Sequence, residues 1–385
     1  MNSRHYKTLT CGLAMILLAS CSVQANADDD FSQALRAVRA VQLNGKGNSS
    51  AVQAMAVLNQ AKPEQIPQML EAMDGVNAIA LNWLRSAINQ AVNRNPDGIP
   101  KDAILKYFEE HSHHPMGRLM AFELLTDGDD SLTESMTRGL IDDPSLPLRF
   151  KAIEQLVGEA ESAMESDKVT ATGKLGYALS KARDVSQIQS IATKLESLGV
   201  QVDLQDQLGM LNTWHLVGSF DNKDQKGFDV VYGPESNVAE VDLTATYDGI
   251  DESPSAWKKV TTGDPVGNVD LNSLVGKIKG ATVYAYTTFK YQEDQDAQFR
   301  IGSANATKIW LNGELVMSNE IYHNSNSIDK FIGDVKLKKG DNQILIKVCQ
   351  NEQTEPWAQD WQFQFRICDQ SGKAIPEFVP PAQQY

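Results

Sequence analysis

The sequence has few cysteines, no excess of basic residues and no long apolar run outside its N-terminal segment. Of 385 residues, 4 are cysteine, and 35 basic residues face 50 acidic ones, which gives a formal net charge of -15. So acidic a chain argues against binding to nucleic acid or to anionic lipid, and solubility alone explains the charge. No other segment approaches the ~20 apolar residues of a membrane-spanning helix, so none is predicted to span a bilayer.

The first 27 residues are predicted to be an export signal. Arg4 and Lys7 precede an apolar core, Leu13–Leu18, that is too short to span a bilayer. The stretch Leu18-Ala19-Ser20-Cys21 resembles the bacterial lipobox, in which the cysteine is lipidated and becomes the new N-terminus. We therefore predict a lipoprotein of the periplasm or outer membrane, held to the membrane only through a lipid on Cys21. Cleavage after Ala27 is the alternative.

Removing this signal leaves two cysteines, Cys349 and Cys368, and export would permit them to form a disulfide. Alternating apolar residues over 361–367 predict a strand whose opposite face carries Cys368 at its end. If this strand formed a hairpin with the strand before Cys349, Cys349 would lie next to the connecting loop and Cys368 at the far end of the strand. The two cysteines would then be several residues apart at ~3.3 Å each, beyond the Cα separation that a disulfide allows. If the two strands are not partners, the objection disappears, so the pairing stays open.

Residues 28–205 are predicted to be helical throughout. Apolar residues recur at three- and four-residue spacing, for example at Phe31, Leu35 and Val38. Asn-Gly, Asp-Gly and proline breaks divide this region into helices of roughly ten to eighteen residues with short connections. Such spacing is what a stack of helix pairs requires.

A weak internal repeat lies within the helical region: Arg118, Ala121, Glu123 and Leu125 are followed 31 positions later by Arg149, Ala152, Glu154 and Leu156. The stretch Asp143–Ala152 resembles the HEAT-repeat pattern, in which the aspartate caps the second helix and the arginine braces the neighbouring repeat. The resemblance implies an N-terminal α-solenoid of HEAT-like helix pairs. Such arrays are scaffolds, and their motif implies no chemistry.

From about residue 206 the pattern becomes β-rich, with glycine turns and alternating apolar faces that predict a sandwich of about eight strands. The pair Asn312-Gly313 between two short apolar runs predicts a two-residue hairpin, with Ile309 and Leu311 in register against Val316. The strands expected from the pattern are 214–220, 283–289, 299–301, 307–311, 344–348 and 361–367.

The segments Ile309–Gly313 and Leu337–Val348 resemble the corresponding strands of the galactose-binding-like jelly roll, found as sugar-binding modules beside bacterial glycosidases and esterases. Trp214–Asn222 and Tyr232–Glu235 resemble the lead-in that precedes such modules in exported bacterial proteins. The fold class implied is multidomain α plus β: a HEAT-like domain over 28–205 and an antiparallel β-sandwich of the jelly-roll type over 206–385.

The resemblance places a ligand rim on aromatic and polar residues of two loops, because sugars in such modules lie over an aromatic ring beside polar groups. The candidates are Tyr322, His323, Asp329 and Trp357. The alternative is structural: Trp357 would cap the sandwich and Tyr322 would hold its loop. Trp310 and Trp361 are predicted to lie in the core.

Metal candidates are few, and no other cofactor is predicted. The spacing of Asp221, Asp224 and Asp229 loosely resembles that of the oxygen ligands in a calcium loop. Structural Ca²⁺ is also common in this class of sandwich. Lys223 lies among them, and a surface turn explains the same residues. The run His111, His113 and His114 lacks the spacing of a zinc site and suits a helix C-terminus.

Two function classes follow. The first is a non-catalytic scaffold whose helical stack meets an envelope protein and whose jelly roll binds glycan or protein. The second is a polysaccharide-active enzyme of the glycoside hydrolase type, with a site between the two domains. Paired carboxylates cannot be assigned from sequence, and Gly-x-Ser-x-Gly nucleophile motifs are absent, so the binding class is favoured.

Overall fold

The computed structural model describes residues 29–378, so the predicted export signal, Cys21 included, lies outside the described residues. A helical region over residues 29–208 is followed by antiparallel sheets over residues 213–368. The chain divides into two compact units, Met1–Leu156 and Val157–Tyr385. Within residues 29–378, no helix has the length and apolar character needed to cross a bilayer.

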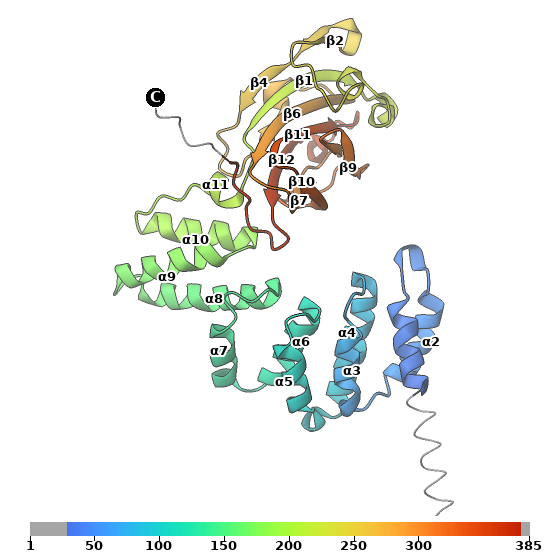
Figure 1. Ribbon diagram of the computed structural model, residues 1–385, viewed down its shortest axis with the longest axis vertical. Coiled ribbons are helices and arrows are strands. Elements are labelled where there is room, and N and C mark those ends of the chain that lie inside the picture. The colour runs from blue at the N-terminus through green and yellow to red at the C-terminus, as the bar shows by residue number, and fades with distance from the viewer. Residues whose placement is uncertain (1–28, 379–385) are drawn as a thin grey trace, which may run out of the picture. The chain divides into compact units, whose positions relative to one another are not determined.

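The helices are short and closely connected, as the spacing of apolar residues predicts (Figure 1). Residues 29–39 form the first of them. The α-helices that follow are α2 (Asn48–Leu58), α3 (Ile66–Glu71), α4 (Ala78–Arg94), α5 (Lys101–Glu109), α6 (Pro115–Thr126), α7 (Asp130–Arg138), α8 (Leu146–Ala163), α9 (Lys168–Lys181), α10 (Val185–Ser197), α11 (Leu204–Leu208) and α12 (Leu271–Leu274). Short 3-10 helices are η1 (Leu43–Gly45), η2 (Pro63–Gln65), η3 (Pro96–Gly98), η4 (Lys223–Phe228), η5 (Gly233–Glu235), η6 (Ile250–Glu252) and η7 (Pro356–Ala358).

A buried ion pair joins α6 to the segment that precedes α8. Arg118 on α6 is 1% exposed, and its two terminal nitrogens donate to the carboxylate oxygens of Asp143 at 2.6 and 2.8 Å. Asp143 also accepts from the backbone N–H of Ser145, and Arg149 Nε donates to the Asp143 carbonyl oxygen at 2.9 Å. The arginine of the first repeat copy therefore binds the aspartate that begins the second.

The predicted histidine run joins α5 to α6 and holds a neighbouring turn. His113 Nδ1 lies 2.7 Å from a carboxylate oxygen of Asp74, and its ring stacks on Tyr107 with centroids 3.9 Å apart. His114 donates its backbone N–H to Asp74, and its ring Nδ1 accepts from Met116 N at 3.1 Å. His114 is thus the N-cap of α6, and the run marks the start of a helix as well as the end of one.

Because the His114 ring can take up a proton, the stability of this helix cap depends on pH. Burial lowers the pKa of His114 below its ordinary value of 6.5, and the nearby Asp74 carboxylate opposes this only in part. His114 therefore binds its proton at a higher pH in the unfolded chain than in the folded chain. The folded state loses stability as pH falls from about 6.5 through the folded pKa of His114. We expect His114→Asn, which keeps a capping oxygen, to reduce the fall of the melting temperature between about pH 7 and pH 5.

Asn77→Ala is the control, because Asn77 caps α4 with a side chain that does not titrate. It should leave the pH dependence unchanged. If His114→Asn melts with the same pH dependence as the unaltered chain, His114 does not carry the effect.

The sheets contain twelve strands within the described residues. This exceeds the eight or so predicted, because β2 to β5 are only two to four residues long and show little apolar alternation. The strands are β1 (Thr213–Asp221), β2 (Thr246–Asp248), β3 (Pro254–Ala256), β4 (Lys258–Thr261), β5 (Val269–Asp270), β6 (Ala281–Tyr291), β7 (Gln295–Gly302), β8 (Ala306–Leu311), β9 (Glu314–Asn319), β10 (Phe331–Leu337), β11 (Gly340–Cys349) and β12 (Gln362–Cys368).

Two antiparallel sheets share one hydrophobic core. One has the strand order β4-β1-β6-β11-β8-β9 and the other β10-β7-β12-β5, while β2 and β3 form a separate pair. Inward-facing residues of both sheets are buried together, and Trp214 of the first sheet meets Phe363 and Phe365 of the second edge-on at 5.2 and 5.8 Å. The predicted strand over 361–367 supplies Trp361 to this core.

The predicted hairpin at Asn312-Gly313 is confirmed. Asn312 has φ +51° and Gly313 φ +91°, so both turn residues are left-handed. The turn joins β8 to β9, and Leu311 pairs with Glu314. The predicted register differs in one respect: Ile309 pairs with Met317, because the pairing shifts between Ile309 and Trp310 and gives the ladder a bulge.

Replacing Gly313 by valine is expected to cost about 1–3 kcal/mol of stability, since a β-branched residue is strained at positive φ. A Cβ at this position would also lie 3.1 Å from that of Ala239. Gly263→Val is the matched control, because nothing lies within 4 Å of a Cβ there and its φ is not left-handed. Thermal melts measure both, and an equal effect of the two changes would contradict the role given to the turn.

The two cysteines are buried and unpaired. The strands before them lie in different sheets, since β11 pairs with β6 and β8 whereas β12 pairs with β7 and β5. The hairpin considered from the sequence is therefore not formed. Cys349 instead accepts a hydrogen bond from Thr282, and burial raises the pKa of each thiol to about 11.

Helix α11 is joined to the sheets by hydrogen bonds. Gln205 donates to the carbonyl oxygen of Asp264 at 2.5 Å, and Asn212 donates to Gln205. Met210 forms a β-bridge with Arg366 of β12. The sequence pattern changes from helices to strands near residue 206. The boundary between the two compact units lies earlier, so that α9, α10 and α11 belong to the same unit as the sheets.

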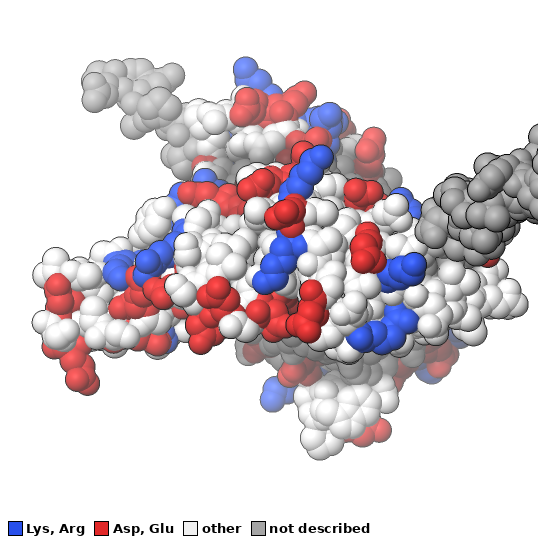
Figure 2. Space-filling view, turned by 90° about the horizontal axis from the view of Figure 1, so that it is seen from below, with Lys and Arg blue, Asp and Glu red and all other residues white. Residues whose placement is uncertain are grey.

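Acidic and basic side chains are interspersed on the face shown in Figure 2. The exposed ion pair between Arg138 and Glu134 is an example of such alternation.

Candidate functional site

The structure brings two predicted rim residues together, His323 and Trp357. Their rings meet edge-to-face, with centroids 5.0 Å apart and an interplanar angle of 89°. Trp357 is 62% exposed, which is unusual for so large an apolar side chain. This exposure argues against the alternative in which Trp357 caps the core.

Hydrogen bonds fix the orientation of the His323 ring. His323 has φ +56°, and its Nε2 lies 2.7 Å from Oδ1 of the buried Asn351. Because the Asn351 amide donates its Nδ2 to Gln353, the oxygen of the amide faces the imidazole. In the neutral ring Nε2 therefore donates, and Nδ1 keeps a lone pair that can accept a hydrogen bond from a ligand.

Trp357 lies on η7, and hydrogen bonds from Lys279 and Gln359 hold this segment. Lys279 donates its ammonium to the Ala358 carbonyl oxygen at 2.7 Å, and the Gln359 amide donates to the carbonyl oxygens of Thr354 and Glu355. Burial lowers the pKa of Lys279, an effect that nearby acidic groups oppose. The loop thus presents the indole ring without burying it.

Tyr322 does not belong to this exposed pair. Its ring packs against a cluster that contains Phe228, Ala306 and Cys349, and its hydroxyl accepts from Asn222 at 3.3 Å. Burial raises the pKa of Tyr322 to about 12. Tyr322 therefore holds its loop against the sheet, in agreement with the structural alternative predicted for it.

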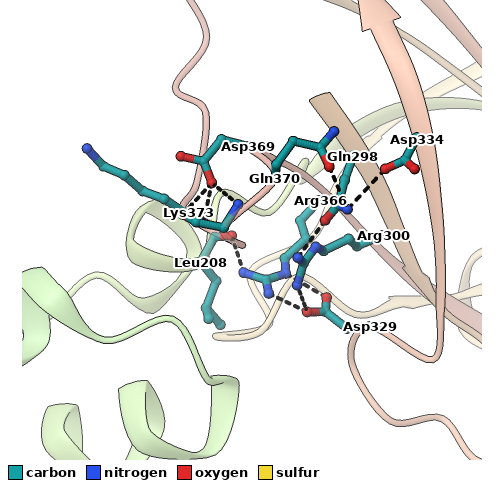
Figure 3. A network of polar contacts seen from close by, with 10 residues as sticks. Leu208, Gln298, Arg300, Asp329, Asp334, Arg366, Asp369, Gln370 and Lys373 are labelled. Carbon is teal, nitrogen blue, oxygen red and sulfur yellow. Dashed lines mark hydrogen bonds and ion pairs between the residues drawn. The ribbon is translucent and has the colours of Figure 1, made fainter. Parts of the chain in front are cut away.

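Asp329 lies in an ion-pair network on the outward face of β7 and β12 (Figure 3). Its two carboxylate oxygens accept from Nε and a terminal nitrogen of Arg366, and one of them also accepts from Arg300 at 2.7 Å. Arg366 donates its other terminal nitrogen to the Leu208 carbonyl oxygen of α11. Burial by itself would raise the pKa of Asp329, but the two guanidinium groups outweigh it and lower the value.

The three predicted metal-binding aspartates make other contacts. Asp221 accepts from the backbone N–H of Lys223, Asp224 pairs with Lys226 at 3.0 Å, and Asp229 pairs with Lys308 at 2.9 Å. Residues 29–378 contain no group of three His, Cys, Asp or Glu side chains placed to hold a metal ion. The prediction of structural Ca²⁺ gains no support from this geometry and stays a prediction.

The sequence does not predict a second buried charge network, which Lys347, Glu235 and Tyr284 form. Lys347 of β11 is fully buried, and its ammonium donates to Glu235 Oε1 at 2.6 Å and to two backbone carbonyl oxygens at 2.7 and 3.1 Å. Tyr284 also donates its hydroxyl to Glu235. Burial and the Glu235 carboxylate raise the pKa of Tyr284 well above its usual range. Alternation along β11 indicates only that Lys347 faces away from the core, not that a loop covers it.

The sequence signal for Asn351 is equally weak. It is one amide in a polar loop, and only the folded chain places it behind His323. The arrangement that results is an exposed indole ring, a fixed imidazole with a free acceptor and a polar loop. Such a set suits the binding of a ligand with one apolar face and several hydroxyl groups.

No family model and no curated protein matches the sequence. Among solved structures, it is similar to the beta-glucosidase from Kluyveromyces marxianus, at 18% identity over 42% of this chain and 17% of that one, with a TM-score of 0.26. It is also similar to an anti-sigma factor domain-containing protein from Clostridium clariflavum, at 14% identity over 45% and 49% of the two chains and a TM-score of 0.25. The chain thus spans less than half the length of either, and likeness at this level carries no functional argument.

Proposed function

We propose that this chain is a non-catalytic binding and scaffold protein of the cell envelope, exported and anchored through a lipid on Cys21. In this proposal the helices form a HEAT-like solenoid, and the two sheets form a galactose-binding-like jelly roll that binds carbohydrate at Trp357. The Arg118–Asp143 pair supports the first assignment, since it joins two repeat copies. The shared core of two antiparallel sheets supports the second.

The exposed indole ring of Trp357 is the observation that carries the proposal. Leaving such a ring in water forgoes the roughly 1.5–3 kcal/mol that burial of a large apolar side chain provides. A sugar offers the ring an apolar C–H face, while its hydroxyl groups can donate to the free Nδ1 of His323. The polar loop beside the ring supplies further partners, among them Gln353 and Gln359.

Trp357→Ala is expected to weaken glycan binding by about tenfold or more, because exposed aromatic anchors carry much of the affinity of such sites. The melting temperature should change little, because few contacts are lost by a side chain that is 62% exposed. A glycan-array screen of the full chain identifies the ligand, and calorimetry then compares the variants.

Val231→Ala is the matched control, since Val231 is 67% exposed and lies in another loop. It should affect neither binding nor melting. If no glycan binds the full chain, or if Trp357→Ala binds as well as the unaltered chain, the proposed function is wrong. If Trp357→Ala instead loses several kcal/mol of stability, as truncation of a core tryptophan does, the ring is part of the packing.

A further inference from the structure

A second candidate site lies within the unit Val157–Tyr385, where α9, α10 and α11 meet the turn after β12. It is a cavity of about 420 Å³, lined by residues of 180–188, 206–207, 291–295 and 369–376. This volume lies within the roughly 300–1,000 Å³ of small-molecule sites. One part of its lining is apolar and is formed by Ile188, Tyr291 and Ile375.

Two of the four charged side chains that line the cavity are already engaged. Arg183 donates to the carbonyl oxygens of Ser180 and Ala182. Asp369 accepts from the backbone N–H and hydroxyl of Ser371 and from the backbone N–H of Lys373. The contacts of Asp369 hold the turn after β12, and those of Arg183 hold the segment between α9 and α10.

The other two charged residues, Lys373 and Asp206, are exposed, and their charged groups make no hydrogen bond or ion pair within residues 29–378. Both line the same cavity, yet they form no ion pair with each other. Lys373 follows β12 and Asp206 lies on α11, so the two opposite charges come from different elements. In Figure 3 the Lys373 side chain extends away from the Arg366–Asp329 network.

We propose that this cavity binds a short peptide with free termini and apolar side chains. Its carboxylate pairs with the Lys373 ammonium and its own ammonium pairs with Asp206, while an apolar side chain packs against Ile188, Tyr291 and Ile375. A zwitterion neutralises both charges at once, which neither an anion nor a cation can do. This site is independent of the carbohydrate site at Trp357.

Isothermal titration of the full chain with three probes tests the proposal: leucyl-phenylalanine, its N-acetyl derivative and its C-terminal amide. The free dipeptide is expected to bind, and each blocked form should bind at least about tenfold more weakly, because each loses one charge pair. Absence of binding by the free dipeptide, or equal binding by all three probes, overturns the proposal.

Two variants test which residue binds each terminus of the peptide. Lys373→Met should abolish the preference for the free acid over the amide and keep the preference for the free amine. Asp206→Asn should do the opposite. Lys226→Met, which removes an exposed lysine of another loop, should change neither preference. If Lys373→Met and Asp206→Asn both keep the two preferences of the unaltered chain, the dipeptide binds elsewhere and the assignment of this cavity fails.

Discussion

Replacing Asp329 by asparagine is expected to lower the free energy of unfolding by about 3–5 kcal/mol, the usual effect of removing one partner of a buried ion pair. Asp329 is the carboxylate that both Arg300 and Arg366 contact, and these arginines are 8% and 1% exposed. Without it, two guanidinium groups stay buried, and neither has another ion pair within the described residues. Chemical denaturation of the full chain, followed through the transition of the sheet unit, measures the loss.

Asp334→Asn provides the control for this prediction. Asp334 lies nearby and accepts from Gln298 at 3.0 Å, but it is exposed and contacts neither arginine. We expect its replacement to change stability by less than about 0.5 kcal/mol. Equal effects of the two substitutions would show that the arginines do not depend on Asp329.

The network also has a predictable response to pH. Because the pKa of Asp329 is lowered in the folded state, its contribution is present above the unfolded value of 3.8 and is lost as pH falls through the folded pKa. The difference in stability between the unaltered chain and Asp329→Asn should therefore shrink in acid.

Local sequence signals predict those parts of the fold that depend on a few neighbouring residues. Asn312-Gly313 predicts its hairpin because only the conformation of two adjacent residues is needed. The alternation of Trp361 and Phe363 predicts a buried strand face for the same reason. The order of strands is not local: β11 lies between β6 and β8, and no pattern within β11 indicates either partner.

In the candidate site, too, local sequence predicts some features, whereas others depend on residues far away in the chain. Exposed loop aromatics can be proposed from sequence, and the ring contact of His323 with Trp357 is consistent with that choice. Asp329 stands in a similar loop, yet its carboxylate is taken up by Arg300 and Arg366, which are far away in sequence. A carboxylate that binds a ligand and one that neutralises buried arginines look alike until the fold places their neighbours.

The second large effect is expected at Glu235, whose replacement by glutamine should cost about 3–5 kcal/mol. Glutamine keeps the size of the side chain but removes the charge that faces the Lys347 ammonium at 2.6 Å. Lys347 is fully buried, so its ammonium would keep only neutral acceptors, the glutamine amide oxygen and two backbone carbonyl oxygens, and no counter-charge. Denaturation of the single variant against the unaltered chain measures the cost.

The double replacement Lys347→Met with Glu235→Leu separates the cost of an unpaired charge from the value of the pair. A buried ion pair barely repays the desolvation of its two charges, so apolar residues of similar volume can replace it with little loss. The double variant should therefore recover most of the stability that Glu235→Gln loses, although the Tyr284 hydroxyl forfeits its acceptor. If the double variant is as unstable as the single one, the loop over residues 228–235 depends on the pair itself. Lys347 and Glu235 would then be needed to hold this loop against the six-stranded sheet, and not only to neutralise each other.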